Sequence, residues 1–166
     1  MPPPPEEVFE TILVVDDNES VLRVVVAILE KANFSVLSAD SGEAAIRLAA
    51  QTHQPIHLLL SDVDMPDMSG PALGETLKAA RPEMHVMLMS GQHDGNLLVL
   101  NYGWAFIRKP FVPVRLVEMV TDVLHSTNRS QLGGEEFDSR KDTSSNRQQD
   151  PKTRKDQADT DGKTSG

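Results

Sequence analysis

Five short apolar runs, separated by segments with helical patterning, constrain the fold of this 166-residue chain more than any other feature of its sequence. The runs have the length of β-strands and largely lack polar alternation, which is typical of parallel strands covered on both faces. Strands that alternate with helices across short connections predict a parallel sheet with helices on both sides. We therefore predict an α/β fold, a three-layer (βα)5 sandwich, with strands at TILVV (11–15), FSVLS (34–38), IHLLLS (56–61), MHVMLM (84–89) and WAFI (104–107).

The segments between the runs carry signals for the starts of helices. Asn18 precedes an apolar stripe with helical spacing and is expected to cap the first helix. Asp40 and Glu43 have the spacing of a capping box before the second helix, and Ser69 is expected to cap the third. The remaining two predicted helices are a short one over 94–101 and one from Pro113 to about His125.

The two ends of the chain differ in composition from its middle. Beyond residue 128 the large apolar residues are only Leu132 and Phe137, so this segment cannot bury enough surface to offset its ordering entropy. We predict a disordered polar tail over 128–166, one domain over 10–127, and a proline-rich, acidic lead-in over 1–9.

Composition narrows the class of protein further. The chain has no cysteine, which excludes disulfides and thiolate metal sites. Residues 1–127 carry the whole net charge of −9, so the predicted domain lacks the basic footprint of a nucleic-acid surface. The apolar runs are too short to span a bilayer, and the N-terminus lacks the pattern of a secretory signal. We expect a cytoplasmic protein without direct contact to nucleic acid or membrane.

Polar residues stand at the ends of four of the five predicted strands. Asp16 and Asp17 follow the first, Asp62 the third, Ser90 the fourth and Lys109 the fifth. Sites in parallel α/β sheets lie outside the carboxyl ends of the strands, so these side chains are expected to converge. Carboxylates that are brought together repel unless a cation lies between them, and an all-oxygen site with few protein ligands suits Mg²⁺. The order and spacing predict a magnesium site that also holds a hydroxyl group and an ammonium group.

The four stretches ILVVDDNE, LLLSDVDMPDMSG, VMLMSG and AFIRKPF together resemble the receiver domain of two-component response regulators, the CheY-like superfamily, over about residues 10–127. MSGPAL and RPEMHVMLMSG are similar to receivers associated with hybrid sensor histidine kinases. The resemblance implies a flavodoxin-like sheet of order 2-1-3-4-5. It also implies a phosphoacceptor aspartate that receives its phosphoryl group from a histidine kinase or a histidine phosphotransfer protein.

The resemblance assigns roles to the acidic residues. Asp62 matches the phosphoacceptor, whose carboxylate attacks phosphorus and becomes 4-aspartylphosphate. Asp17 would ligate Mg²⁺ directly and Asp16 mainly through water, with Asp62 and the backbone carbonyl of Asp64 completing the protein ligands. Mn²⁺ is the alternative ion. Asp67, in contrast, is interpreted as a turn residue.

The remaining groups fit phosphoryl transfer, in which catalysis consists mostly of positioning and charge neutralisation. Lys109 would pair with Asp62 and then with a phosphoryl oxygen, and the resemblance implies a cis peptide bond between Lys109 and Pro110. Ser90 would donate a hydrogen bond to a second phosphoryl oxygen, and the amide of Val63 to a third. Ser90 and Phe106 occupy the positions of the family's conformational switch.

The chain departs from the family pattern in two places. Phe106 stands where many relatives have tyrosine, so it has no hydroxyl group to hold an inward orientation. The segment from Ser90 to Lys109 is about one helical turn shorter than is common, which bears on the output face formed by the fourth and fifth helices. Asp64 and Gln92 lie at positions that vary in the family and tune dephosphorylation.

Several readings of the role remain open at this point. LLLSDVDM also contains the hhhhDxD pattern of haloacid dehalogenase-like aspartyl phosphatases, although that class carries it on the first strand. No DNA-binding output motif follows the receiver-like segment, so we expect a stand-alone phosphorelay element. We expect this element to be a monomer or a weak dimer. A receiver that works through its tail is an alternative, and a degenerate, phosphorylation-independent receiver is less favoured because every expected group is present. We expect a phosphoacceptor rather than a turnover enzyme.

Overall fold

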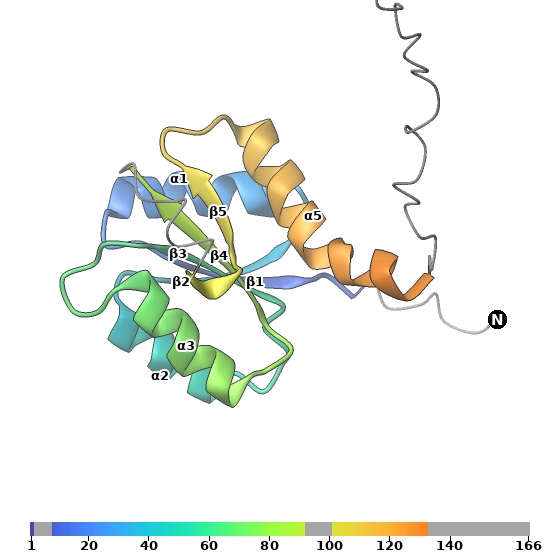
Figure 1. The fold of residues 1–166 in the computed structure, drawn as a ribbon. Coiled ribbons are helices and arrows are strands. Elements are labelled where there is room, and N and C mark those ends of the chain that lie inside the picture. Colours follow the sequence, from blue (N-terminus) through green and yellow to red (C-terminus); the bar gives the residue numbers. More distant parts are fainter. Residues whose placement is uncertain (2–7, 92–100, 133–166) are drawn as a thin grey trace, which may run out of the picture. The chain divides into compact units, whose positions relative to one another are not determined.

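The sheet has the predicted architecture. The computed structural model describes residue 1, residues 8–91 and residues 101–132. Within them five parallel strands form one sheet in the order β2-β1-β3-β4-β5, which confirms the flavodoxin-like order (Figure 1). Strands β2 to β5 begin one or two residues later than predicted. The strands are β1 (Thr11–Val15), β2 (Ser35–Ala39), β3 (Leu58–Asp62), β4 (His85–Ser90) and β5 (Ala105–Arg108).

Helices cover both faces of this sheet and give the predicted three layers. Helices α1 and α5 lie on one face, and α2 and α3 on the other (Figure 1). The predicted helix over 94–101 falls almost entirely on residues 92–100, which lie outside the described residues. The described helices are α1 (Glu19–Lys31), α2 (Gly42–Gln51), α3 (Gly70–Ala80) and α5 (Pro113–Leu132).

Two apolar cores lie on the two faces of the sheet. Alternate strand residues point to opposite faces, so Ile12 and Val14 join the core under α1 and α5, whereas Leu13 and Val15 join the core under α2 and α3. All five residues of β1 are buried. Burial on both faces explains why the strands show no polar alternation in the sequence. Because the strands are parallel, their carboxyl ends lie along the same side of the sheet, where the polar residues are found.

The helix caps confirm two predictions and correct a third. The side chain of Asn18 accepts hydrogen bonds from the first turn of α1, and Ser69 does the same for α3, as predicted. Helix α2 is capped by Ser41, whose hydroxyl oxygen accepts from the Ala44 N–H at 3.2 Å, so the prediction of an Asp40 cap is wrong. The carboxylate of Asp67, in another loop, also accepts hydrogen bonds from this helix terminus, from the N–H groups of Gly42 and Glu43.

Helix α5 continues to Leu132, beyond the predicted end near His125 and five residues into the predicted polar tail. The predicted tail over 128–166 thus overlaps α5 at 128–132, and residues 133–166 lie outside the described residues. Most of the predicted lead-in, residues 2–7, lies outside them as well. Among the described helices none has both the length and the apolar character needed to cross a membrane.

Candidate functional site

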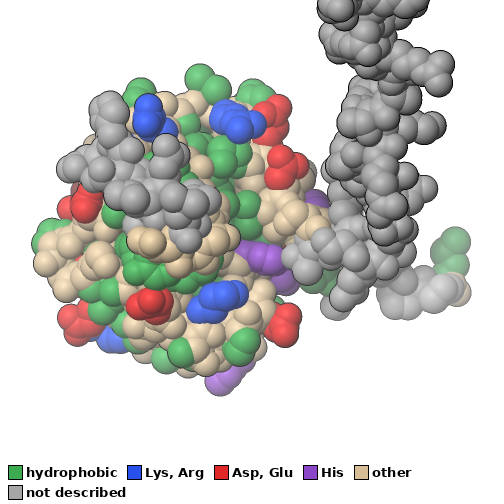
Figure 2. All heavy atoms as spheres, in the orientation of Figure 1, with side chains coloured by type: hydrophobic (Ala, Val, Ile, Leu, Met, Phe, Trp, Pro, Cys, Tyr) green, Lys and Arg blue, Asp and Glu red, His purple; other side chains and the backbone are tan. Residues whose placement is uncertain are grey.

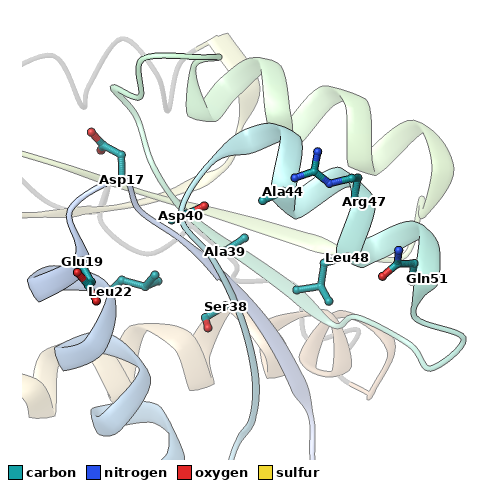
Figure 3. Close-up of a pocket in the computed structure, with 10 residues that line it drawn as sticks. All are labelled: Asp17, Glu19, Leu22, Ser38, Ala39, Asp40, Ala44, Arg47, Leu48 and Gln51. Carbon is teal, nitrogen blue, oxygen red and sulfur yellow. The ribbon is translucent and has the colours of Figure 1, made fainter.

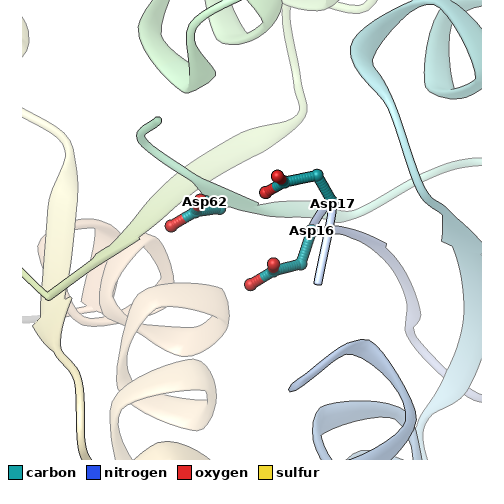
Figure 4. Close-up of side chains that lie close together, drawn as sticks. All are labelled: Asp16, Asp17 and Asp62. Carbon is teal, nitrogen blue, oxygen red and sulfur yellow. The ribbon is translucent and has the colours of Figure 1, made fainter. Parts of the chain in front are cut away.

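Three carboxylates meet at the carboxyl ends of β1 and β3. Strands β1 and β3 are neighbours, and Val15 pairs with Ser61, so Asp16 and Asp17 follow β1 beside the point where Asp62 ends β3. One carboxylate oxygen from each of the three residues lies within 4.8 Å of the others (Figure 4). Asp16 and Asp62 are buried, with exposed fractions of 1% and 8%, and Asp17 is exposed. The sequence-predicted acids are therefore brought together.

Lys109 pairs with two of these acids. Its ammonium group lies 2.7 Å from Asp16 Oδ2 and 3.0 Å from Asp62 Oδ1. The backbone N–H of Lys109 donates to the Ser90 carbonyl at 2.8 Å, which continues the pairing of β4 and β5 to the edge of the sheet. The peptide bond between Lys109 and Pro110 is cis, as the resemblance implied. The contact between Lys109 and Asp62 before phosphorylation is confirmed.

The electrostatics of the cluster are unbalanced. Burial raises the pKa of Asp62, and the charges of Asp16 and Asp17 raise it further against the opposing effect of Lys109. Burial works against the charged form of Lys109, but its hydrogen bonds to Asp16 and Asp62 prevail, so the pKa of Lys109 is raised. The ammonium group stays protonated at neutral pH, yet it is one positive charge beside a cluster of three carboxylates. A further cation would relieve the repulsion that remains.

The oxygen atoms of this cluster fit Mg²⁺. The donor set consists of carboxylates at the mouth of a sheet, which suits a hard cation that keeps several of its waters. Both oxygens of Asp16 already accept hydrogen bonds, Oδ1 from the Asn18 N–H at 2.9 Å and Oδ2 from Lys109. Asp16 therefore has less capacity for direct ligation than an exposed carboxylate such as Asp17.

The two predicted switch residues lie on one face of the sheet. Phe106 of β5 pairs with Leu88 of β4, and Ser90 follows Leu88 by two residues, so both side chains point toward α2 and α3. Ser90 is buried at the end of β4, and Phe106 is half-buried against the core on that face. Gln92 lies outside the described residues.

The loop between β3 and α3 departs from the prediction at two residues. The Val63 N–H donates to the carbonyl of Met89 in β4 at 2.9 Å, so it extends the sheet and does not point at a phosphoryl group, and the predicted role of this amide is corrected. Asp67 is more than a turn residue, because its carboxylate accepts hydrogen bonds from the first turn of α2. No local pattern predicts this contact, because it joins residues that are 24 and 25 positions apart in the chain. Asp64 is exposed.

Two hollows flank the cluster. The α1–α2 pocket includes Asp17 on its rim but neither Asp16 nor Asp62, so it adjoins the acidic site without containing it. Figure 3 shows its lining residues, Asp17, Glu19, Leu22, Ser38, Ala39, Asp40, Ala44, Arg47, Leu48 and Gln51.

The second hollow, here named the α1–α5 groove, is apolar and begins directly beside Lys109. Val24, with an exposed fraction of 57%, lines both of its halves. On the face shown in Figure 2 the basic side chains of the described residues are scattered among acidic ones and form no continuous patch. The main residues of the groove are Val21, Val24, Val25, Ala27, Ile28, Pro110, Phe111, Pro113, Val114 and Val117.

Comparisons with known proteins agree with this geometry. The family model of the response regulator receiver domain matches residues 12–121. The solved receiver domain of hybrid histidine kinase CckA is 32% identical, with a TM-score of 0.60, and the match covers 69% of this chain and 98% of that one. The chain belongs to the response regulator receiver domain family, a class of signalling phosphoacceptors in two-component systems. The haloacid dehalogenase-like alternative is not retained.

Longer proteins contain similar segments. The two-component response regulator ARR10 of Arabidopsis thaliana is 27% identical over 121 residues, which are 73% of this chain and 22% of that protein. Sensor kinase CckA of Brucella abortus (strain 2308) is 28% identical over 117 residues, 69% of this chain and 12% of that protein. The chain thus spans about a fifth or less of the length of these relatives.

Proposed function

We propose that this chain accepts a phosphoryl group on Asp62, in a Mg²⁺-dependent transfer from the phosphohistidine of a histidine kinase or a histidine phosphotransfer protein. One observation carries the proposal: the buried carboxylate of Asp62 pairs with the ammonium group of Lys109 and lies beside the acidic pair Asp16 and Asp17. A structural ion pair would need one acid for one lysine. Three carboxylates beside one lysine leave excess negative charge, which suits a site that binds a metal cation and then accepts a phosphoryl group.

The chemistry follows from the positions of these groups. An oxygen of Asp62 attacks phosphorus, the phosphorus–nitrogen bond of the phosphohistidine breaks, and the imidazole leaves with the bonding electron pair. The product is an acyl phosphate on Asp62. Lys109 is already 3.0 Å from Asp62 Oδ1 and needs to move little to pair with a phosphoryl oxygen. The ammonium group of Lys109 would then neutralise part of the negative charge of the phosphoryl oxygens.

The metal ligands are proposed from the same geometry. When bound, Mg²⁺ (or Mn²⁺) supplies positive charge that offsets the carboxylates and the transferred phosphoryl oxygens. Asp17 would bind it directly, together with Asp62 and the carbonyl oxygen of Asp64. Asp16 would act mainly through water, because both of its oxygens already accept hydrogen bonds.

Ser90 and Phe106 are proposed to report the phosphoryl group. A hydroxyl group at the end of β4 would donate to a phosphoryl oxygen, since a fixed donor stabilises added negative charge. Phe106 lies on the same face one strand away and would move inward as Ser90 shifts. With no hydroxyl bond to hold it, the inward state would be favoured by packing alone, which gives a shallow equilibrium.

The α1–α5 groove supports a protein as the phosphodonor. Its apolar lining lies beside Lys109 and includes exposed valines, which a small phosphodonor such as acetyl phosphate would not need. We therefore propose that the donor protein docks here, and that the chain acts as a cytoplasmic phosphorelay element without direct contact to nucleic acid or membrane, as a monomer or weak dimer.

The test of the proposal is chemical labelling. Incubated with Mg²⁺ and acetyl phosphate, the full chain should gain one acid-stable, base-labile phosphoryl group, located on Asp62 by peptide mapping. Asp64→Asn serves as the matched control, because it neutralises a nearby exposed carboxylate and leaves its backbone carbonyl in place; it should still be labelled. A phosphoryl group on another residue would refute the assignment.

A further inference from the structure

The loop that follows Asp62 is fixed at its base. The Gly70 N–H donates to the carbonyl of Val63 at 2.8 Å, which closes residues 63–69 into a compact loop. A Cβ atom at position 70 would lie 2.2 Å from the carbonyl oxygen of Asp62, so only glycine fits there. The start of the loop and the start of α3 are therefore held against each other. The middle of this loop contains Asp64, whose carbonyl oxygen is one of the proposed metal ligands.

The outer part of the loop is held by Asp67. Its Oδ2 accepts a hydrogen bond from the Glu43 N–H at 2.9 Å, and its Oδ1 accepts one from the Gly42 N–H at 3.3 Å. These amides belong to the first turn of α2, where N–H groups have no partner within the helix and favour an anion. Met68 adds an apolar contact, because a Cβ at position 42 would lie 2.6 Å from its Cγ. The hydrogen bonds also lower the pKa of Asp67, that with Glu43 most, so the carboxylate stays ionised at neutral pH.

The first turn of α2 is connected in turn to the other acidic loop. Three residues before Gly42, the carbonyl of Ala39 at the end of β2 accepts a hydrogen bond from the Asp16 N–H at 3.3 Å. The contacts thus form a closed path that runs from Asp62 through Asp67, α2 and the end of β2 to Asp16. The two loops that supply the proposed metal ligands are joined by this path as well as by the sheet.

We infer that Asp67 is a positioning residue for Mg²⁺ binding: by fastening the β3–α3 loop to α2, it holds the Asp64 carbonyl at a fixed distance from Asp16 and Asp17. The inference rests on the proposed function, since it concerns the ligands of the same site. A loop that is already ordered loses less conformational entropy when its carbonyl binds the ion, so the bound state is reached at lower Mg²⁺ concentration.

The test compares three variants of the full chain by Mg²⁺ titration calorimetry. Asp67→Ala removes both hydrogen bonds and should weaken Mg²⁺ binding by about fivefold, somewhat less than the loss typical of groups that orient a ligand side chain. Asp67→Asn removes the charge but keeps an acceptor for the Glu43 N–H, and should fall between wild type and Asp67→Ala. Asp40→Ala is the matched control, because it removes an exposed carboxylate on the α2 side of the site without touching the loop. It should bind Mg²⁺ as wild type does.

Two further readouts separate positioning from general destabilisation. In the metal-free protein, amide exchange at Gly42 and Glu43 should become faster in Asp67→Ala while the thermal midpoint changes little, since Asp67 is exposed. At saturating Mg²⁺ the labelling rate with acetyl phosphate should return to that of wild type.

The inference is overturned if Asp67→Ala binds Mg²⁺ with wild-type affinity. It is equally overturned if Asp40→Ala, or Asp67→Asn, is weakened as much as Asp67→Ala, because charge alone would then explain the loss. A wild-type chain that binds Mg²⁺ but takes no phosphoryl group would defeat the proposed function and leave the comparison of affinities valid. A wild-type chain that binds no Mg²⁺ would defeat both.

Discussion

Polar groups are paired differently at the two ends of the strands, here called the amino edge (the amino-terminal ends) and the carboxyl edge (the carboxyl-terminal ends) of the sheet. At the amino edge, polar groups satisfy one another: the Thr11 N–H donates to His57 Nδ1 at 2.8 Å, and His125 Nε2 lies 3.0 Å from Glu10 Oε1. At the carboxyl edge, three carboxylates lie together, and the ammonium group of Lys109 pairs with two of them, Asp16 and Asp62. The polar groups named at the amino edge have partners, whereas the carboxylates at the carboxyl edge need added positive charge to balance them. The proposed chemistry lies at the end of the sheet where the charges are not balanced.

The largest expected difference between the two edges is the loss of phosphorylation in the Asp62→Asn variant. The variant keeps the shape of the side chain and removes the nucleophile, so labelling by acetyl phosphate should fall to background. Glu10→Gln is the matched change at the amino edge and should leave labelling unaffected. Normal labelling of Asp62→Asn, measured by mass spectrometry, would break the comparison at its centre.

The next effect concerns the metal. Asp17→Ala should weaken Mg²⁺ binding about tenfold or more, and Asp16→Ala should weaken it less, because direct ligation outweighs a contact through water. Calorimetry measures both affinities. Equal affinities for the two variants and wild type would show that the acidic cluster does not bind the ion.

The α1–α5 groove offers a test that separates docking from chemistry. Val24→Asp places a charge on its exposed apolar wall and should reduce phosphorylation by a partner kinase about tenfold, while labelling by acetyl phosphate stays within about twofold of wild type. Glu30→Ala, an exposed position on α1 outside the groove lining, is the control. A parallel loss with both donors would mean that Val24 affects the site itself.

The sequence predicted those parts of the fold and site that depend on local signals. The strands follow from apolar runs, and the caps Asn18 and Ser69 follow from residue type directly before a helix. Ser41 was missed because Asp40 and Ser41 are adjacent and both are of residue types that cap helices, so residue type alone does not choose between them. The Val63 amide was misassigned because its pairing with Met89 depends on where β3 ends relative to β4. The last turns of α5 were missed because its polar residues there give no periodic signal. Long-range hydrogen bonds explain the errors at Asp67 and Val63, but not the error at the end of α5.

A smaller effect concerns the switch. With beryllofluoride as a phosphoryl mimic, side-chain NMR of labelled Phe106 should show enrichment of the inward orientation, which the metal-bound protein without the mimic already populates in part. Ser90→Ala should still be phosphorylated but should uncouple the two positions. If Phe106 stays unchanged while distant backbone signals shift, the signal leaves the site by another route.

The smallest expected effect is the response of stability to acid, which should differ in sign between the two edges. The pKa of Asp62 is raised in the folded state. In the absence of Mg²⁺ its ionised carboxylate therefore lowers the free energy of unfolding above that pKa. This effect disappears as the pH falls to the ordinary pKa range of a carboxyl group. Asp62→Asn should therefore raise Tm by a few degrees at pH 7 and lose this advantage near pH 4.

At the amino edge the sign is reversed. Burial lowers the pKa of His85, helped by the positive charge of Lys78 and opposed by Glu10 and Glu83, so stability is lost as the pH falls from about 6.5 through that lowered pKa. His85→Gln should flatten this loss in thermal scans between pH 7 and pH 5. The same slope in the variant and in wild type would show that His85 does not contribute.

The close approach of Gly70 to the carbonyl of Asp62 has a consequence for how this site tolerates change over generations. Because Gly70, the eighth residue after Asp62, must lie against the backbone of Asp62, the loop between them has a fixed length as well as a fixed end. An insertion or deletion within residues 63–69 would move either Asp62 or the start of α3. Sequence drift in this stretch should proceed by substitution alone, so the spacing of the two residues is a more durable mark of the site than any side chain between them.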